Sequence, residues 1–148
     1  MKKVRDIMVR DISAISGEQT LRDAARIIAT YRYGGIPVVD EEHRVIGFIS
    51  ERDVVQSEFP QLGRSKSFSF FKDIAGMVKR LSSVGEQKVK DIMSKKPIWV
   101  DEEDTLIDVV RLILEKGVKV VPVVRDGLLV GVVGRGEVCR ELFEPDSL

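Results

Sequence analysis

The sequence has very few of the residues that bind metals or form covalent cross-links. Its 148 residues include one cysteine, Cys139, and one histidine, His43. A single cysteine cannot form a disulfide within the chain or supply a cysteine metal cluster. No apolar run approaches the roughly 18 residues of a membrane span, and the first residues, MKKVRDIMVRDIS, lack the apolar stretch of a signal peptide. We therefore expect a soluble, cytoplasmic protein without a metal site.

The sequence also lacks an excess of charge of either sign. There are 24 Lys and Arg residues against 24 Asp and Glu residues, so the formal net charge is zero. A dedicated nucleic-acid-binding protein usually carries a basic excess, so we expect no nucleic-acid partner. The spacing of the polar residues suggests no catalytic triad, and His43 stands in the turn-like segment DEEHR. We therefore predict a binding protein and not an enzyme.

What the sequence does contain is an internal repeat. The pentapeptide VRDIM at 4–8 recurs as VKDIM at 89–93, an offset of 89 − 4 = 85 residues. Residues 20–39 share 8 identities in 20 with residues 105–124, again at an offset of 85. One residue is then lost, so that Gly47 matches Gly131. Self-similarity at a fixed spacing indicates two copies of one structural unit.

Each copy has the pattern of a helix, two strands and a second helix. Apolar residues spaced i, i+3, i+4, i+7 predict amphipathic helices at 21–28 and 106–113, with Thr20 and Thr105 as N-caps. The β-branched segments IPVVD and VPVVR predict strands, whose prolines we expect at a strand start or a sheet edge. The predicted fold class is α+β, with two tandem helix-strand-strand-helix repeats packed as a pseudo-two-fold pair.

The repeat sets the expected domain boundaries. The first copy covers 1–57, the second covers 89–148, and residues 58–88 connect them. Apolar residues at helical spacing in the connecting segment are Phe71, Ile74, Val78 and Leu81. We expect a connecting helix or linker packed on the core or on a dimer; a lid over a ligand, or a partner-binding segment, is the alternative.

The segment GFISERD at 47–53 joins a predicted strand to a predicted helix. A helix N-terminus attracts phosphate through its free N–H groups and its dipole, and the hydroxyl of Ser50 adds a donor. The carboxylate of Asp53 only accepts hydrogen bonds, which suits the hydroxyls of a ribose. The same two residues also match a capping box that merely begins a helix. Spacing alone leaves both interpretations open.

The second copy departs from this segment. Its counterpart is GVVGRGE at 131–137, with Gly134 and Glu137 at the matching positions. Gly134 lacks the hydroxyl, and Glu137 is one methylene longer than an aspartate. The departure favours the first copy as the ligand site.

The order of these motifs, seen twice, resembles a tandem pair of CBS domains, often called a Bateman module. The resemblance covers nearly the whole chain except residues 56–88 and the last few. It implies a regulatory module that binds an adenosine nucleotide (AMP, ADP or ATP), or S-adenosylmethionine, in clefts between the copies, with no cofactor required. It also implies that Ser50 and Asp53, in the pattern G-h-h-S/T-x-x-D (h apolar), contact phosphate and ribose while the other copy holds the adenine.

The resemblance predicts two clefts in this sequence. The ligand-binding residues predicted for the first cleft are Ser50, Arg52, Asp53, Ser94, Trp99, Lys119, Val120 and Pro122. Those predicted for the second cleft are Ala14, Gly34, Gly35, Ile36, Pro37, Gly134, Arg135 and Glu137. Trp99 either stacks on the base or packs in the core, and Lys119 either contacts a phosphate or lies at a solvated strand edge.

The resemblance further implies a homodimer that signals to another protein. Because nothing else is fused to the repeats in this sequence, we expect an effector that acts in trans. Apolar residues off or beside the helix stripes, which predict a helical dimer surface, are Ile27, Leu112, Leu114, Val138, Cys139 and Phe143. Cys139 is otherwise expected in the core. The alternative function is a dimerisation scaffold that binds no nucleotide.

Overall fold

The structure, a computed structural model, describes residues 2–31, 33–59 and 85–144. Most of the predicted connecting segment, including the apolar stripe from Phe71 to Leu81, therefore lies outside the described residues. Within the described ranges, no helix is long and apolar enough to cross a membrane.

The elements recur in the same order in the two copies. The first copy contains α1 (Val4–Ile7), β1 (Ile15–Ser16), α2 (Leu21–Tyr31), β2 (Gly35–Val39), β3 (Val45–Ser50) and α3 (Glu51–Glu58). The second contains α5 (Val89–Ile92), β4 (Val100–Asp101), α6 (Leu106–Lys116), β5 (Val120–Arg125), β6 (Leu128–Gly134) and α7 (Arg135–Phe143). The predicted repeat and the helix-strand-strand-helix unit are confirmed. The sequence patterns missed the short helix and short strand that precede the unit in each copy.

Each copy forms a three-stranded sheet around a buried central strand. The strand orders are β1-β2-β3 and β4-β5-β6, with a parallel first pair and an antiparallel second pair. Pro37 and Pro122 lie within the central strands β2 and β5. However, β1 pairs only with Val38 and Val39 of β2, so at Pro37 the strand has a partner on one side only. Proline is tolerated at such an open edge, since it has no N–H to donate.

The long helices begin at the threonines predicted as caps. The Thr105 N–H donates to Asp108 Oδ2 at 2.8 Å, and the Asp108 N–H donates to Thr105 Oγ1 at 3.4 Å. Thr20 and Asp23 make the same exchange at 3.2 Å in each direction. These bonds satisfy N–H groups that have no partner within the helix. At its other end α6 stops at Gly117, whose φ of 65° turns the chain into β5.

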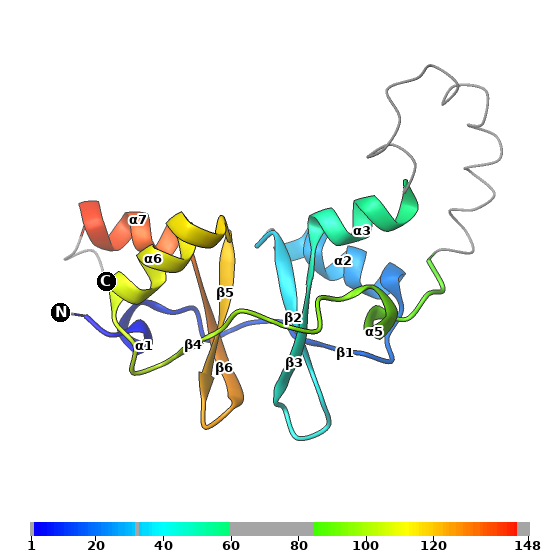
Figure 1. The fold of residues 1–148 in the computed structure, drawn as a ribbon, viewed down its shortest axis with the longest axis horizontal. Helices are drawn as coiled ribbons and strands as arrows, with labels where there is room; N and C mark the ends of the chain where they lie inside the picture. The colour runs from blue at the N-terminus through cyan, green and yellow to red at the C-terminus, as the bar shows by residue number, and fades with distance from the viewer. Residues whose placement is uncertain (1, 32, 60–84, 145–148) are drawn as a thin grey trace, which may run out of the picture.

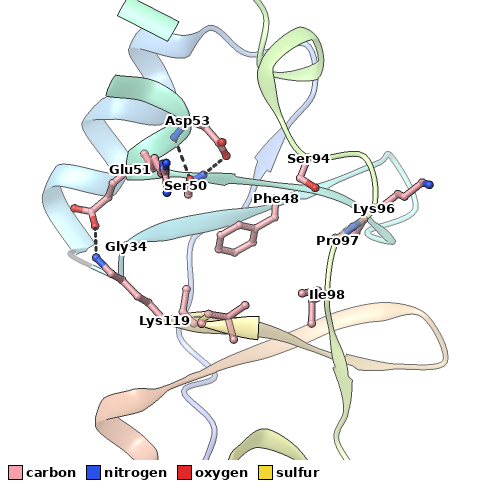
Figure 2. A pocket seen from close by; sticks show the side chains of 14 residues that line it. Gly34, Phe48, Ser50, Glu51, Asp53, Ser94, Lys96, Pro97, Ile98 and Lys119 are labelled. Atoms are coloured by element: carbon pink, nitrogen blue, oxygen red, sulfur yellow. Dashed lines mark hydrogen bonds and ion pairs between the residues drawn. The ribbon is translucent and has the colours of Figure 1, made fainter. Parts of the chain in front are cut away.

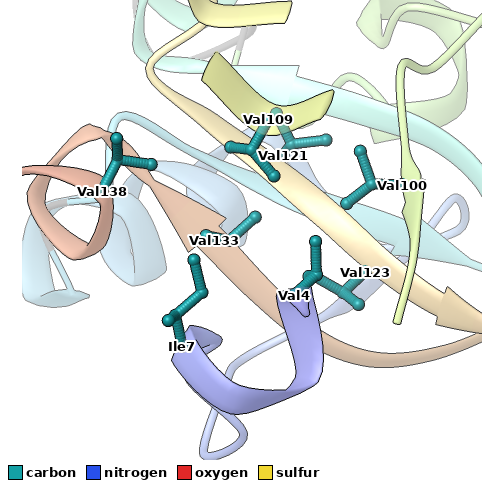
Figure 3. Packing of buried hydrophobic residues seen from close by; sticks show 8 residues of the cluster. All are labelled: Val4, Ile7, Val100, Val109, Val121, Val123, Val133 and Val138. Atoms are coloured by element: carbon teal, nitrogen blue, oxygen red, sulfur yellow. The ribbon is translucent and has the colours of Figure 1, made fainter. Parts of the chain in front are cut away.

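The two apolar cores exchange their first helices. Val4 and Ile7 of α1 are buried in the core of the second copy, and Figure 3 shows them beside Val123 and Val133. Val89 of α5 is buried in the core of the first copy. Each sheet is therefore completed by a helix that belongs, along the chain, to the other repeat.

Backbone hydrogen bonds fix this exchange in both directions. The Val4 N–H donates to the Asp104 carbonyl at 2.8 Å, and the Val89 N–H donates to the Gln19 carbonyl at 2.9 Å. The two contacts are equivalent under the repeat, as expected for the predicted pseudo-two-fold pair. The boundaries 1–57 and 89–148 stay predictions, while each compact half in space takes its first helix from the other copy along the chain.

The two halves lie side by side, as Figure 1 shows. Helices α2 and α3 lie beside one sheet and α6 and α7 beside the other, while both strand hairpins point away from these helices. Among the residues predicted for a dimer surface, Val138 is buried, and Ile27 and Leu112 pack against the two cores. Val138 is wrong as a surface residue because α7 turns it inward, whereas Ile27 and Leu112 are only partly buried and stay predictions for the dimer surface. Leu114 and Phe143 are exposed, at 78% and 82%.

Candidate functional site

A pocket of about 510 Å³ lies between the two copies. Its volume falls within the roughly 300–1,000 Å³ of small-molecule sites. Residues of both copies contribute to it, and Figure 2 shows it from close by. The residues that line this first pocket are Gly34, Phe48, Ser50, Glu51, Arg52, Asp53, Ser94, Lys96, Pro97, Ile98, Gly117, Val118, Lys119 and Val120.

Ser50 and Asp53 line the first pocket and also form the capping box of α3. The Asp53 N–H donates to Ser50 Oγ at 3.1 Å, and the Ser50 N–H donates to Asp53 Oδ2 at 2.9 Å. Among the described residues, the box leaves the hydroxyl proton of Ser50 and Oδ1 of Asp53 without a partner. The two interpretations left open by the sequence are therefore compatible, since the cap uses only part of each side chain.

The first turn of α3 keeps one backbone donor for a ligand. The Glu51 N–H donates to the Gly34 carbonyl at 2.9 Å, and the N–H groups of Ser50 and Asp53 are used by the capping box. Of the four donors at this helix end, the Arg52 N–H is the one with no partner within the described residues. Arg52 is also one of the residues that line the pocket. This corner combines a helix dipole, a free N–H and a cation, which suits an anion.

A largely apolar part of the pocket is formed by Phe48 of the first copy together with Pro97 and Ile98 of the second. Reciprocal backbone hydrogen bonds of 3.2 and 2.9 Å pair Phe48 of β3 with Ser94. Three residues after this pairing, Pro97 and then Ile98 line the pocket. Figure 2 shows the Phe48 ring lying between Ser50 and Ile98. A flat apolar group would find surface at Phe48, Pro97 and Ile98.

An ion pair joins the copies at the rim of the pocket. Lys119 Nζ lies 3.8 Å from Glu51 Oε1, with the side chains 62% and 52% exposed. Exposed pairs of this kind contribute about 0–1 kcal/mol. Lys119 is therefore held weakly and is available to an anion that enters the pocket.

The structure brings together most of the residues predicted for the first cleft. Those that line the first pocket are Ser50, Arg52, Asp53, Ser94, Lys119 and Val120. Trp99 is 50% exposed and lies neither in the core nor in the pocket wall. Its neighbour Ile98 lines the pocket instead, because the chain passes the pocket at residues 96–98. Pro122 is buried inside β5.

Sequence reasoning missed several residues of the first pocket. These are Phe48, Glu51, Lys96, Pro97, Ile98, Gly117 and Val118, while Gly34 was assigned to the second cleft only. The sequence could have predicted Phe48 as a pocket residue. It stands two residues before Ser50, and side chains two apart on a strand share a face. The others depend on how the second copy packs over the first.

A second pocket of about 350 Å³ lies beside the first. It is lined by Tyr33, Gly34, Glu51, Lys119, Val120, Gly134, Arg135, Gly136 and Glu137. Of the residues predicted for the second cleft, those outside this wall are Ala14, Gly35, Ile36 and Pro37. A side chain at Gly35 would begin 2.5 Å from the Phe48 ring, so this glycine makes room for Phe48 and not for a ligand. Ile36 and Pro37 are buried in β2.

The start of α7 resembles that of α3 without the hydroxyl. The Gly134 N–H donates to Glu137 Oε2 at 2.8 Å, as Ser50 does to Asp53. No side chain at Gly134 can return the bond to the Glu137 N–H. Half of the capping box is therefore kept in the second copy.

The remaining polar candidates lie outside both pockets. His43 is exposed in its turn at φ 66°, as expected. Cys139 is exposed, so its predicted place in the core was wrong; Val138, one position earlier on α7, points inward instead. Among the described residues, no group of three or more His, Cys, Asp or Glu side chains could hold a metal ion.

The chain is similar in sequence to several known proteins. The chain is 30% identical over 142 residues to the CBS domain-containing protein CBSX1, chloroplastic, of Arabidopsis thaliana, covering 90% of this chain and 60% of that relative. The chain thus spans less than two thirds of that relative's length. It is 27% identical over 160 residues to the protein MJ1426 of Methanocaldococcus jannaschii, covering 95% and 90% of the two chains.

Solved structures and a family model complete the comparison. The crystal structure of CBSX2 in complex with AMP matches with a TM-score of 0.76 and 26% identity, over 98% of each chain. The family model for the CBS domain matches residues 4–58 and 89–144, which are the two copies of the repeat. The chain therefore belongs to the CBS-domain family, as a tandem pair of CBS repeats.

Proposed function

We propose that this protein is a regulatory module that binds an adenosine nucleotide in the first pocket. The observation that carries the proposal is the polarity of this pocket. The pocket combines an anion-attracting helix start, at Ser50 and Arg52, with an apolar surface at Phe48 and Ile98. A nucleotide has the same division into a charged end and a flat base. The similarity to CBSX2, whose structure is a complex with AMP, supports the choice of ligand.

Each part of the nucleotide has matching residues in the pocket. The free Oδ1 of Asp53 accepts hydrogen bonds from ribose hydroxyls. The hydroxyl of Ser50 and the backbone N–H of Arg52 donate to a phosphate, with Lys119 as a mobile cation. The base lies against Phe48 and Ile98, where stacking on an aromatic face contributes roughly 1–3 kcal/mol.

We favour AMP over ADP or ATP because the positive charge of Arg52 and Lys119 is partly offset by the carboxylate of Glu51. Glu51 lines the same pocket and lies 3.8 Å from Lys119. Each further phosphate adds negative charge beside this carboxylate. S-adenosylmethionine, which carries a cation in place of phosphate, is the second candidate ligand, because Glu51 and Asp53 give this end two carboxylates.

We further propose that the module is a homodimer without catalytic activity. The presence or absence of ligand would change its conformation and thereby its action on a separate effector protein. A ligand that touches both copies favours one relative angle of the two halves, by as much as its affinity differs between angles. A cytoplasmic location stays a prediction.

The test compares two matched acids by isothermal titration with AMP. Asp53 and Glu137 each accept the N–H of the residue that precedes their helix, at 2.9 and 2.8 Å. Asp53→Ala and Glu137→Ala should therefore lose similar stability, about 0.3–1 kcal/mol. Only Asp53→Ala also removes the ribose acceptors. Hydrogen bonds to a charged group contribute roughly 1.5–3 kcal/mol, so AMP affinity should fall about ten- to a hundredfold.

The outcomes separate the alternatives. Equal AMP affinity in wild type and both variants would mean that Ser50 and Asp53 only begin a helix. Loss in Glu137→Ala alone would place the ligand in the second pocket. A thermal-shift panel with AMP, ADP, ATP and S-adenosylmethionine covers the ligand class, since a ligand at 100 times its Kd adds about 2.7 kcal/mol of apparent stability. No shift with any of them would favour the scaffold function.

A further inference from the structure

The two pockets share one wall. Gly34, Glu51, Lys119 and Val120 line both of them. Only two of these four residues carry charge, and they form the ion pair between the copies. A single cation and a single carboxylate therefore stand between two neighbouring pockets.

The repeat does not place a second Lys–Glu ion pair at the equivalent positions of the two copies. At the offset of 85, the counterpart of Lys119 is Gly34, and at the offset of 84, the counterpart of Glu51 is Arg135. Arg135 lines only the second pocket, and Arg52 lines only the first. The pseudo-two-fold symmetry is thus broken at this wall, where Lys119 is the one cation among the described residues that lines both pockets.

The space around the pair allows Lys119 to move. A Cβ at Gly34 would lie 3.3 Å from Lys119 Cδ and 3.4 Å from Glu51 Oε1, so glycine leaves the stem of the lysine uncrowded. The ion pair is long, at 3.8 Å, and both side chains are more than half exposed. An exposed pair of this kind is held weakly, and a phosphate in either pocket can draw Lys119 to its own side.

From this shared wall we infer that the two pockets bind phosphorylated ligands in competition for Lys119. A phosphate that engages Lys119 leaves the Glu51 carboxylate uncompensated. A second phosphate in the other pocket then meets that carboxylate and lacks the cation. Binding in one pocket weakens binding in the other by the same factor in both directions. The inference rests on the proposed nucleotide binding in the first pocket.

The experiment follows the two pockets separately by NMR during titration with AMP. The amides of Ser94 and Ile98 report on the first pocket only, and those of Arg135 and Gly136 report on the second only. In wild type, we expect the second-pocket amides to saturate at higher AMP than the first. In Asp53→Ala, which weakens the first pocket, the second-pocket midpoint should move to AMP concentrations at least about fivefold lower.

Two controls show whether Lys119 carries the effect. In Lys119→Met, which keeps the hydrocarbon stem, adding Asp53→Ala should leave the second-pocket midpoint unchanged. Titration with adenosine, which has no phosphate, should show independent pockets in wild type. A second-pocket midpoint that is the same in wild type and Asp53→Ala, or second-pocket amides that never respond to AMP, would overturn the inference while first-pocket amides still respond. Silence of all four amides in wild type would instead overturn the proposed function, and the inference with it.

Discussion

At the scale of single residues, the hydroxyl of Ser50 can both cap a helix and donate to a ligand. The oxygen accepts the Asp53 N–H at 3.1 Å and so caps α3, while the proton stays available to the pocket. Thr105 makes the same cap at α6, with its hydroxyl also donating to Asp108 Oδ2 at 3.0 Å, but it lines neither pocket. Comparing the two caps therefore separates helix capping from ligand binding.

We expect Ser50→Gly to weaken AMP binding while the helix cap is nearly kept. Glycine at an N-cap costs only a few tenths of a kcal/mol. A lost hydrogen bond to a charged phosphate costs roughly 1.5 kcal/mol, or about tenfold in affinity. Titration calorimetry and thermal unfolding measure the two effects. Thr105→Gly is the control, with a similar small change in stability and unchanged AMP affinity; a loss of affinity in both variants would contradict the assignment.

Glu18 predicts a pH dependence of stability. Hydrogen bonds from Lys88 and then Lys90, at 2.6 and 2.7 Å, lower the pKa of Glu18 from 4.5 to about 2. Because the pKa is depressed in the folded state, the stabilisation by Glu18 is fully present above about pH 4.5 and is lost as the pH falls toward 2. The gap in melting temperature between wild type and Glu18→Gln should therefore be constant near neutral pH and close in acid.

The effect at Glu18 should be small, since the three side chains are largely exposed. Glu41→Gln, in the exposed turn before His43, serves as the control for the removal of one surface carboxylate. A Glu18→Gln gap that stays constant down to about pH 2.5 would show that the lysines do not hold this carboxylate in solution.

At the scale of elements, the exchanged helices α1 and α5 hold the pair together. Each has four residues, too few to be stable alone, so both depend on packing against the other copy. The segment that follows each of these helices also packs closely against a strand of the other copy's sheet. A Cβ at Gly131 would lie 2.8 Å from the Val9 carbonyl, and one at Gly47 would lie 2.9 Å from the Ser94 carbonyl. These two equivalent glycines are required because a side chain would collide with the crossing backbone, and not because the chain turns there.

We expect Val4→Ala and Val89→Ala to destabilise opposite halves. Both side chains are fully buried, and the loss of two methyl groups costs about 1–3 kcal/mol. Hydrogen exchange distinguishes the halves. Val4→Ala should speed exchange most in β5 and β6 of the second copy, and Val89→Ala most in β2 and β3 of the first. Faster exchange in the sheet of the variant's own repeat would argue against the exchange of helices.

At the scale of the whole molecule, the backbone is pseudo-symmetric but the helical surface is not. Leu114 and Leu142 are exposed at 78% and 53%. Their counterparts in the first copy, at offsets of 85 and 84, are Ala29 and Glu58. Phe143 adds a further side chain that is 82% exposed. Among the described residues, α6 and α7 thus carry the most exposed apolar side chains, although Val55 on α3 and Tyr31 on α2 are also exposed, at 59% and 48%. The surface of α6 and α7 suits a two-fold interface.

We expect the protein to sediment as a dimer of the 16.6 kDa chain at micromolar concentration. Leu114→Lys combined with Phe143→Lys should shift it to monomer, because the charges would be buried in the interface. Leu128→Lys is the control; this side chain is 41% exposed on the β5–β6 hairpin, away from the helices. A wild type that sediments only as the 16.6 kDa species would remove the helical dimer.

The sequence by itself determined the repeat, the order of the main elements, the threonine caps and the pairing of Ser50 with Asp53. These features depend on neighbours within about one helical turn or on a comparison of the chain with itself. Such information is fully present in the order of residues.

Only the tertiary structure decided which residues meet across the two copies. Phe48 fills the space beside Gly35, Ile98 replaces Trp99 in the pocket wall, and α1 packs in the second core. Lys119 and Glu51 likewise meet only because the copies pack against each other. Packing joins residues far apart along the chain, and a local pattern does not encode the relative position of two units. The physical reason is that each such contact depends on the shape of both copies at once.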